Sequence, residues 1–233
     1  MTDVRRKAID LFCGAGGASM GMYRAGFDVT GVDIALQKHY PFRFLHADAL
    51  TVDLSGYDFV WASPPCQAHT ALRKMWNAKP HPDLIPQTRA KLQAWGGPYI
   101  IENVPGAPLW NSILLCGTMF GLHTPCGAEL RRHRYFESNL FLLSSSCQHG
   151  SSVLGVYGGH SRDRCRVITI AGSTPQQNVV RNRVRKTFSV RDAQVAMGIT
   201  WMTMAELSQA IPPTYAEFLC AQVLSFLMNN IAA

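Results

Sequence analysis

Residues 61–67, with the sequence Trp-Ala-Ser-Pro-Pro-Cys-Gln, place a thiol where it could do covalent chemistry. Cys66 follows two prolines, which come soon after the apolar run at residues 59–62. The apolar run predicts a short buried strand, and the prolines end it and stiffen the turn that carries the cysteine. A thiol at a strand end on a rigid turn is placed as a nucleophile is placed, although most buried cysteines are inert.

A carboxyl group follows another apolar run, in the sequence Ile-Ile-Glu-Asn-Val at residues 100–104. Burial at the end of a strand would raise the pKa of Glu102 and let it donate a proton near neutrality. The carboxyl ends of parallel strands line the ligand crevice of a doubly wound sheet. Cys66 and Glu102 are therefore expected to converge on one substrate.

A glycine-rich turn at residues 10–17, Asp-Leu-Phe-Cys-Gly-Ala-Gly-Gly, would let the backbone approach a ligand. Position 19 is serine, so the dinucleotide fingerprint is incomplete and a dehydrogenase is disfavoured. Asp33 is placed for a ribose hydroxyl and Asp48 for an adenine amino group, although either could be an ordinary loop or cap residue. Together with the turn they predict an adenosine-bearing cofactor that needs no pyrophosphate.

The elements that would position these groups alternate between strand and helix. Such alternation predicts an α/β fold with a doubly wound, mostly parallel sheet. The predicted strands are residues 8–13, 28–33, 59–62 and 99–102, and the predicted helices are residues 17–25, closed by Gly26, and 86–95.

The pattern changes in the second half of the chain. Serines and glycines between residues 141 and 185 predict loops and short strands, as in a small irregular β-rich lobe. Capping-box spacings at Ser189, Thr203 and Thr214 then predict three helices, the last over residues 215–228. We expect a catalytic and cofactor-binding domain at residues 1–140, a reduced recognition lobe at 141–186 and returning helices at 187–233.

Composition narrows the class of protein. A chain of 233 residues with 47% hydrophobic and 16% charged residues predicts a soluble globular protein, and no apolar run approaches the roughly twenty residues of a membrane helix. Neither a secretory signal nor a disulfide framework is visible among seven cysteines, which favours reduced thiols in a cytoplasm. Zinc is the competing interpretation for Cys116, Cys126, Cys147 and Cys165. Since none of them forms a Cys-x-x-Cys pair, no metal is expected.

Positive charge is concentrated in one part of the chain, whose net charge is +7. Residues 131–191 hold eleven of the 22 lysines and arginines but only Glu137 and Asp163 of the 15 acidic residues. A region this basic suggests a polyanionic partner, although a solvated face is the simpler alternative.

Six short blocks of the sequence share their order and spacing with the DNA cytosine-5 methyltransferases. The chain resembles this family over about residues 8–138 and again over 186–223. The blocks are residues 10–17, 31–33, Asp48, 64–67, 102–104 and 132–134. The resemblance implies S-adenosylmethionine as cofactor and S-adenosylhomocysteine as product, with Asp33 at the ribose and Asp48 at the adenine. The implied cofactor residues are Phe12, Gly14, Gly16, Gly17, Asp33, Ile34, Asp48, Ala49 and Pro65.

The resemblance also implies a mechanism. Cys66 would add to carbon 6 of a cytosine flipped out of a DNA duplex, and Glu102 would protonate ring nitrogen 3. Arg134 would hold the cytosine O2, with Arg132 beside the thiol. Apart from the resemblance, alternating arginines are expected to follow the DNA backbone, namely Arg162, Arg164, Arg181, Arg183 and Arg185, and Arg73 is also expected to contact DNA. The protein is expected to act as a monomer in a prokaryotic cytoplasm, without a membrane partner, in the manner of compact phage-encoded members.

Three departures from the family pattern affect the substrate. The family has an arginine block, Gln-x-Arg-x-Arg, which falls on residues 130–134, and Leu130 stands in place of its glutamine. The family's late Gln-x-x-Gly-Asn block falls on residues 209–213, which lack the asparagine, and Thr214 is a partial substitute at best. The segment between these blocks is also short for a recognition region. The same chemistry on RNA or a free cytidine nucleotide, and a non-catalytic DNA-binding relative, therefore stay open as alternatives. The retained Cys66 and Glu102 disfavour the non-catalytic relative. The alternating arginines Arg181, Arg183 and Arg185 disfavour a nucleotide substrate, which would not need them.

Overall fold

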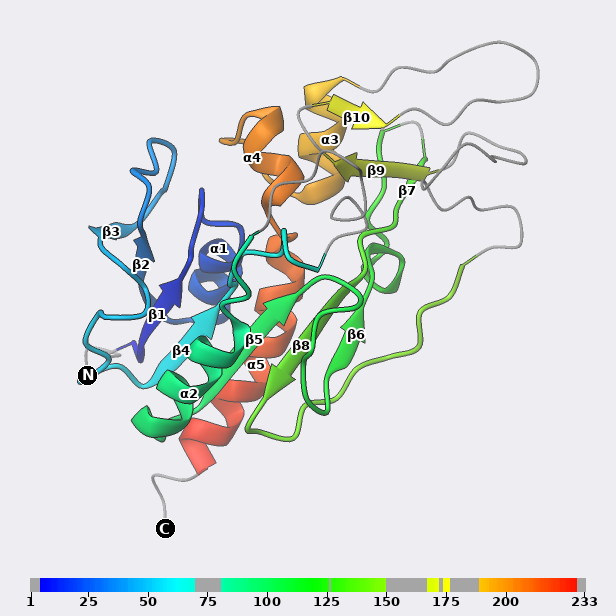
Figure 1. The fold of residues 1–233 in the computed structure, drawn as a ribbon. Coiled ribbons are helices and arrows are strands. Elements are labelled where there is room, and N and C mark those ends of the chain that lie inside the picture. Colours follow the sequence, from blue (N-terminus) through cyan, green and yellow to red (C-terminus); the bar gives the residue numbers. More distant parts are fainter. Residues whose placement is uncertain are drawn as a thin grey trace, which may run out of the picture.

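A seven-stranded sheet forms the centre of the molecule (Figure 1). The computed structural model describes residues 5–69, 81–125, 127–149, 167–171, 174–176 and 189–229. Its strands are β1 Lys7–Leu11, β2 Asp28–Asp33, β3 Arg43–His46, β4 Phe59–Ala62, β5 Tyr99–Asn103, β6 Ile113–Leu115, β7 Glu129–Leu130, β8 Arg134–Ser138, β9 Val167–Ala171 and β10 Thr174–Gln176. Its helices are α1 Gly17–Ala25, α2 Ile85–Trp95, the short 3-10 helix η2 Gly117–Phe120, α3 Val190–Met197, α4 Met204–Gln209 and α5 Pro213–Asn229.

The strand order of the large sheet is β3-β2-β1-β4-β5-β8-β6. The first five strands are parallel, and β8 runs antiparallel to both β5 and β6. This confirms the predicted α/β, mostly parallel, doubly wound sheet. The carboxyl ends of β1, β2, β4 and β5 consequently meet along one edge.

Helices cover both faces of this sheet, which explains why β4 is apolar throughout and why Asp10 on β1 and Glu102 on β5 are buried. Trp61 and Ile100 pack in the core formed with α1 and α5, whereas Val60 and Ile101 pack in the core formed with α2. Figure 1 shows α2 on one side of the sheet and α5 on the other. Because side chains alternate along a strand, each strand contributes to both layers.

The contact between α1 and α5 requires a glycine. A Cβ on Gly21 would lie 2.2 Å from the carbonyl oxygen of Pro213, so any larger residue would push the two helices apart.

Helix α5 begins at Pro213, a residue suited to the first turn of a helix. The prediction that Thr214 caps this helix was therefore wrong, because Thr214 already lies inside it. The capping boxes of Ser189 and Thr203 are confirmed.

A buried ion pair fixes the first antiparallel strand of the sheet. Arg89 on α2 donates from Nε and Nη2 to the two carboxylate oxygens of Glu137 on β8, both at 2.7 Å. Removing one partner of such a pair usually costs about 3–5 kcal/mol, because the other charge stays buried. This pair helps to hold β8, which begins at Arg134.

A second, three-stranded sheet has the order β10-β9-β7. β9 and β10 lie in the segment predicted to contain short strands, and β9 pairs with β7, which precedes that segment in the chain.

Six predicted DNA-contacting arginines fall outside the described residues, namely Arg73, Arg162, Arg164, Arg181, Arg183 and Arg185. The domain boundaries stay a prediction. Among the described residues, no helix is both long and apolar enough to cross a membrane.

Candidate active site and cofactor cavity

A cavity of about 500 Å³ opens at the carboxyl ends of β1, β2, β4 and β5. It is lined by the glycine-rich turn, the end of β2, the proline–cysteine loop after β4, the end of β5, and the segment from α4 to α5. Of the predicted site residues, Phe12, Gly14, Gly17, Asp33, Ile34, Pro65, Cys66, Glu102 and Arg134 line it. Pockets of this size are typical of cofactor and small-molecule sites.

The glycine-rich turn is fastened to the end of β2 by Asp33. The backbone N–H of Gly14 donates to Asp33 Oδ2 at 3.0 Å, and that of Ala35 donates to Oδ1 at 2.9 Å. Strand β1 ends before Cys13, the limit predicted from the sequence, because Phe12 has a positive φ of 60°. Gly16 also has a positive φ, of 86°, and is absent from the cavity lining. The predicted contact of Gly16 with a cofactor stays a prediction.

Two other predicted cofactor residues lie away from the cavity lining. Asp48 is exposed and accepts a hydrogen bond from the N–H of Leu50 at 2.9 Å, while Ala49 is buried in the core beside α2. Their proposed contact with an adenine stays a prediction.

The loop that carries Cys66 is tied to the neighbouring strand. Asn103, at the end of β5, donates from Nδ2 to the carbonyl oxygen of Pro64 at 2.9 Å. Cys66 is partly buried, and its backbone carbonyl accepts from the N–H of His69 at 2.9 Å. These bonds set the thiol on the cavity wall beside Glu102, as the strand-end positions predicted.

Glu102 is 7% exposed and forms an ion pair with Arg134, whose Nε lies 3.0 Å from Glu102 Oε1. Burial raises the pKa of Glu102, while Arg134 and a hydrogen bond from the Ser63 hydroxyl oppose the rise. Burial also raises the pKa of the Cys66 thiol, which Arg134 lowers and Glu102 raises further. The thiol and the carboxyl group are thus electrostatically coupled, with Arg134 acting on both.

Arg132 lies behind this site, outside the cavity lining. It is 5% exposed and donates from Nη2 to the carbonyl oxygen of Ser208 at 2.6 Å. The hydroxyl of Tyr215 on α5 donates to the Arg132 carbonyl oxygen at 2.8 Å. Burial and the nearby Arg134 lower the pKa of Arg132 to about 9. Arg132 therefore connects the arginine block to the late helices and also lowers the pKa of Cys66 from a distance.

Asp10, at the cavity end of β1, is a buried acid that sequence reasoning left without a role. Ser19 donates to its Oδ2, and the Tyr40 hydroxyl donates to Ser19 at 2.9 Å. Oδ1 is buried without a hydrogen-bond partner among the described residues. Burial raises the pKa of Asp10 from 3.8 to about 7.

Asp10→Asn should change how stability depends on pH. Because folding raises this pKa, the acid contributes stability below pH 3.8 that is lost as the pH rises toward about 7. The variant keeps an acceptor for Ser19 but does not titrate. Its melting temperature relative to wild type should therefore rise between pH 5 and pH 8, as measured by scanning calorimetry. Parallel melting curves for the two proteins would contradict this assignment.

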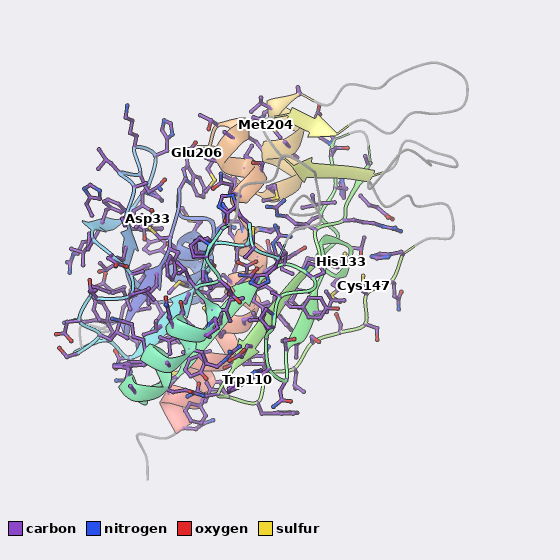
Figure 2. The ribbon with its side chains drawn as sticks, in the orientation of Figure 1. Asp33, Trp110, His133, Cys147, Met204 and Glu206 are labelled. Atoms are coloured by element: carbon purple, nitrogen blue, oxygen red, sulfur yellow. The ribbon has the colours of Figure 1, made fainter. Side chains whose placement is uncertain are left out.

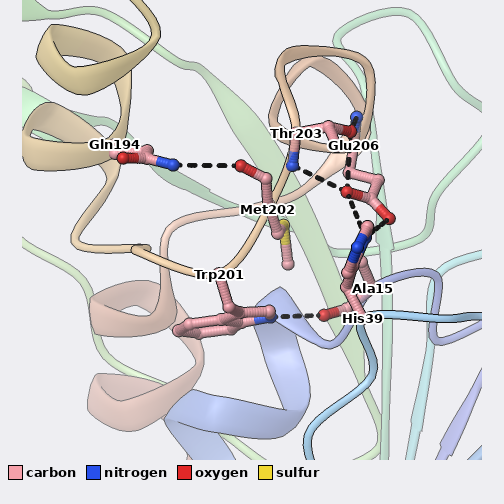
Figure 3. A network of polar contacts seen from close by, with 7 residues as sticks. All are labelled: Ala15, His39, Gln194, Trp201, Met202, Thr203 and Glu206. Atoms are coloured by element: carbon pink, nitrogen blue, oxygen red, sulfur yellow. Dashed lines mark hydrogen bonds and ion pairs between the residues drawn. The ribbon is translucent and has the colours of Figure 1, made fainter.

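Helix α4 is held over the glycine turn by polar contacts (Figure 3). Trp201 donates from Nε1 to the Ala15 carbonyl oxygen at 2.9 Å. Glu206 accepts from the N–H of Thr203 at 2.7 Å and pairs with Nδ1 of His39 at 2.8 Å. Figure 2 shows Glu206 on α4 on the same side of the molecule as Asp33.

The cavity lining also contains polar residues that the sequence did not reveal. The additional polar lining residues are Asp10, Gln37, Ser63, Gln67, Glu206, Ser208 and Gln209, whereas Thr214 does not line the cavity. Ser63 could have been found from its place directly before the two prolines. The residues on α4 approach the cavity only through contacts with distant parts of the chain, which no local pattern shows.

No protein-family profile matches the sequence, and no curated protein matches it. Solved structures do match, across nearly the whole chain. A protein described as a DNA modification methyltransferase of an E. coli prophage is 14% identical over 96% of this chain and 100% of its own, with a TM-score of 0.60. The S. pombe Dnmt2 methyltransferase is 15% identical over 96% and 99%, with a TM-score of 0.61. The Entamoeba histolytica methyltransferase EhMeth is 13% identical over 98% and 99%, with a TM-score of 0.57. Together with the strand order, these matches show that the chain has the fold of S-adenosylmethionine-dependent methyltransferases.

Proposed function

We propose that this protein transfers a methyl group from S-adenosylmethionine to carbon 5 of cytosine in DNA. The observation that carries the proposal is the meeting of Cys66, Glu102 and Arg134 in one cavity with the glycine turn and Asp33. A thiol, a buried acid and a cation are the groups that covalent activation of a cytosine ring needs. They come from three separate blocks of the sequence that the family resemblance had already singled out.

The cavity suits an adenosine-bearing cofactor. Asp33 offers a carboxylate beside the backbone of the glycine turn, and Phe12 and Ile34 add apolar surface. S-adenosylmethionine would supply an electrophilic methyl group on a sulfonium centre. The chain would hold this cofactor on the β1–β2 side and leave the Cys66 side for the base.

In the proposed mechanism, the Cys66 thiolate adds to carbon 6 of the cytosine ring. Carbon 5 of neutral cytosine is a poor nucleophile, and this temporary bond breaks the aromaticity and makes it enamine-like. Glu102, whose pKa is raised by burial, protonates ring nitrogen 3, and Arg134 holds O2. After carbon 5 has been methylated, it loses its proton and the Cys66 sulfur leaves as the thiolate. Return of the nitrogen 3 proton to Glu102 then restores the neutral ring and the acid.

DNA is the proposed partner because of the charge distribution. Residues 131–191 carry eleven of the 22 basic residues of the chain, and one of the two acids among them, Glu137, is buried against Arg89. That acid does not offset surface charge. A flipped cytosine in a duplex, contacted by phosphate-binding arginines, fits this distribution.

Substrate class is tested by incubating the protein with radiolabelled S-adenosylmethionine and one of three acceptors: mixed-sequence duplex DNA, total RNA or cytidine monophosphate. The products are digested to nucleosides and separated. We expect label in 5-methyldeoxycytidine from DNA. Label in 5-methylcytidine from RNA, or in the free nucleotide, would support the alternative substrates. Label on the exocyclic amine would contradict the covalent mechanism.

Asp33→Ala should weaken S-adenosylmethionine binding by at least about tenfold. Hydrogen bonds to a charged group contribute about 1.5–3 kcal/mol, and the variant also releases the N–H groups of Gly14 and Ala35. Asp48→Ala should have a smaller effect, of about fivefold, because Asp48 lies outside the cavity lining. Calorimetry measures both affinities. Unchanged affinity in Asp33→Ala would remove this residue from the cofactor site.

A further inference from the structure

Four side chains gather at a place separate from the cavity described above. The ligand atoms of Cys116, His133, Cys147 and His149 all lie within 4.8 Å of one another. Cys116 follows β6, His133 precedes β8, and Cys147 and His149 belong to the segment after β8. Figure 2 shows His133 and Cys147 close together, away from Asp33 and Glu206. Residues from three parts of the chain thus point at one spot.

The distances between these atoms suit tetrahedral coordination. Cys116 Sγ lies 3.3 Å from His149 Nε2, and His133 Nε2 lies 3.4 Å from Cys147 Sγ. Zinc bonds of about 2.3 Å to sulfur and about 2.0 Å to nitrogen give a sulfur–nitrogen edge of about 3.5 Å. The Cys147 Sγ and His149 Nε2 atoms are closer, at 2.6 Å. They would separate by about 1 Å around a bound ion.

The donor set indicates which metal would bind. Two thiols and two imidazoles select zinc over magnesium or calcium, which prefer oxygen ligands. Four protein ligands complete a tetrahedron and leave no position for a substrate, which is typical of structural sites. The Thr118 hydroxyl donates to Cys116 Sγ at 3.3 Å, the kind of supporting contact that orients a zinc thiolate.

We propose that Cys116, His133, Cys147 and His149 bind one structural zinc ion. This proposal reverses the sequence-based expectation that no metal is present. That expectation considered only cysteines, and it grouped Cys116 and Cys147 with Cys126 and Cys165, which lie outside the described residues. The two histidines had no spacing to a Cys-x-x-Cys pair that could have revealed them.

The site would join two functional parts of the chain. His133 lies between Arg132 and Arg134, and His149 immediately precedes the segment that the structure does not describe within the predicted recognition lobe. Zinc would fasten the start of that lobe to the arginine block. Small lobes with little core of their own commonly use a metal in this way. The proposal does not depend on the substrate of the enzyme.

The first test is the zinc content of the full chain purified under reducing conditions without chelator. Elemental analysis should find about one zinc per chain. Cys116→Ser and Cys147→Ser should lose most of it. Cys66→Ser and His123→Gln should keep it, because these matched thiol and imidazole controls lie outside the cluster. Folded wild-type protein that stays below about a tenth of stoichiometric zinc after incubation with zinc and dialysis would overturn the proposal. Equal zinc loss in the two controls would also overturn it.

The second test uses variants and a spectroscopic probe that still decide the question if the serine variants of the first test do not fold. His149→Cys replaces one ligand by another, so the variant should retain metal, whereas His149→Ala should bind it more weakly. Cobalt added to the metal-free protein should give the visible bands of a tetrahedral site, with stronger thiolate charge-transfer absorption in His149→Cys than in wild type. Octahedral cobalt spectra in both proteins would contradict the proposal. So would a Cys116–Cys147 disulfide found by mass spectrometry in freshly purified wild-type protein.

Discussion

Cys66→Ala should reduce methyl transfer by at least about four orders of magnitude, because removal of a covalent nucleophile leaves only binding and positioning. The thiol lines the cavity beside Glu102, and the Asn103 contact with Pro64 that fixes its loop does not involve the sulfur. The variant should therefore fold normally. Its affinity for S-adenosylmethionine should stay within about threefold of wild type, since most of the predicted cofactor contacts lie on the β1–β2 side and none of them involves the Cys66 sulfur.

Single-turnover assays with labelled cofactor measure the rate, and calorimetry measures the affinity. Cys66→Ser is the matched control, because serine keeps the size of the side chain but is a far weaker nucleophile. Both variants should be inactive. A Cys66→Ala enzyme that retains more than about a tenth of wild-type activity would show that the thiol is not the nucleophile.

Glu102→Gln should reduce the methyl transfer rate by about two to four orders of magnitude, the usual contribution of general acid–base catalysis. Glutamine preserves the shape of the side chain and a contact with Arg134 but cannot donate the proton. Affinity for DNA should be retained. A variant within about threefold of wild type would show that Glu102 has a structural role only.

The same variant should make Cys66 more reactive toward alkylation. The Glu102 carboxylate raises the pKa of the thiol, and Arg134 lowers it. Replacing Glu102 by glutamine removes the opposing charge, so the pKa of Cys66 should fall. Peptide mass spectrometry can follow the rate of Cys66 modification by iodoacetamide as a function of pH. The pH at which this rate reaches half its maximum should be lower in the variant than in wild type. A purely structural loss of activity would not predict greater thiol reactivity.

The sequence predicted the parts of the fold that local patterns determine. Helix α1 and strands β2 and β4 have the predicted bounds, because glycines, charged residues or, after β4, prolines stand at the ends of their apolar runs. Gly26 terminates α1 in a left-handed conformation, as expected of a helix-ending glycine. The antiparallel pairing of β8 with β5 and β6 was not predicted, since it depends on contacts between distant segments.

In the candidate site, too, the sequence predicted the residues that local patterns place and missed those that depend on contacts between distant segments. Cys66 and Glu102 were predicted because Cys66 closely follows one buried strand and Glu102 lies near the end of another, and Asp33 because it ends a third. Ser208 and Gln209 reach the cavity through helix α4, which is held by the contacts of Trp201 with Ala15 and of Glu206 with His39. These contacts join residues more than 160 positions apart, so no spacing rule could have identified them.

Covalent trapping tests the central claim most directly. Wild-type protein is incubated with S-adenosylmethionine and duplex DNA in which 5-fluorocytosine replaces cytosine throughout, so that the recognition sequence need not be known. Fluorine at carbon 5 blocks the final elimination, and the proposed mechanism predicts a denaturant-resistant adduct that peptide mapping assigns to Cys66. Methylation of ordinary DNA by the same preparation, with no adduct on fluorinated DNA or with an adduct at another residue, would contradict it.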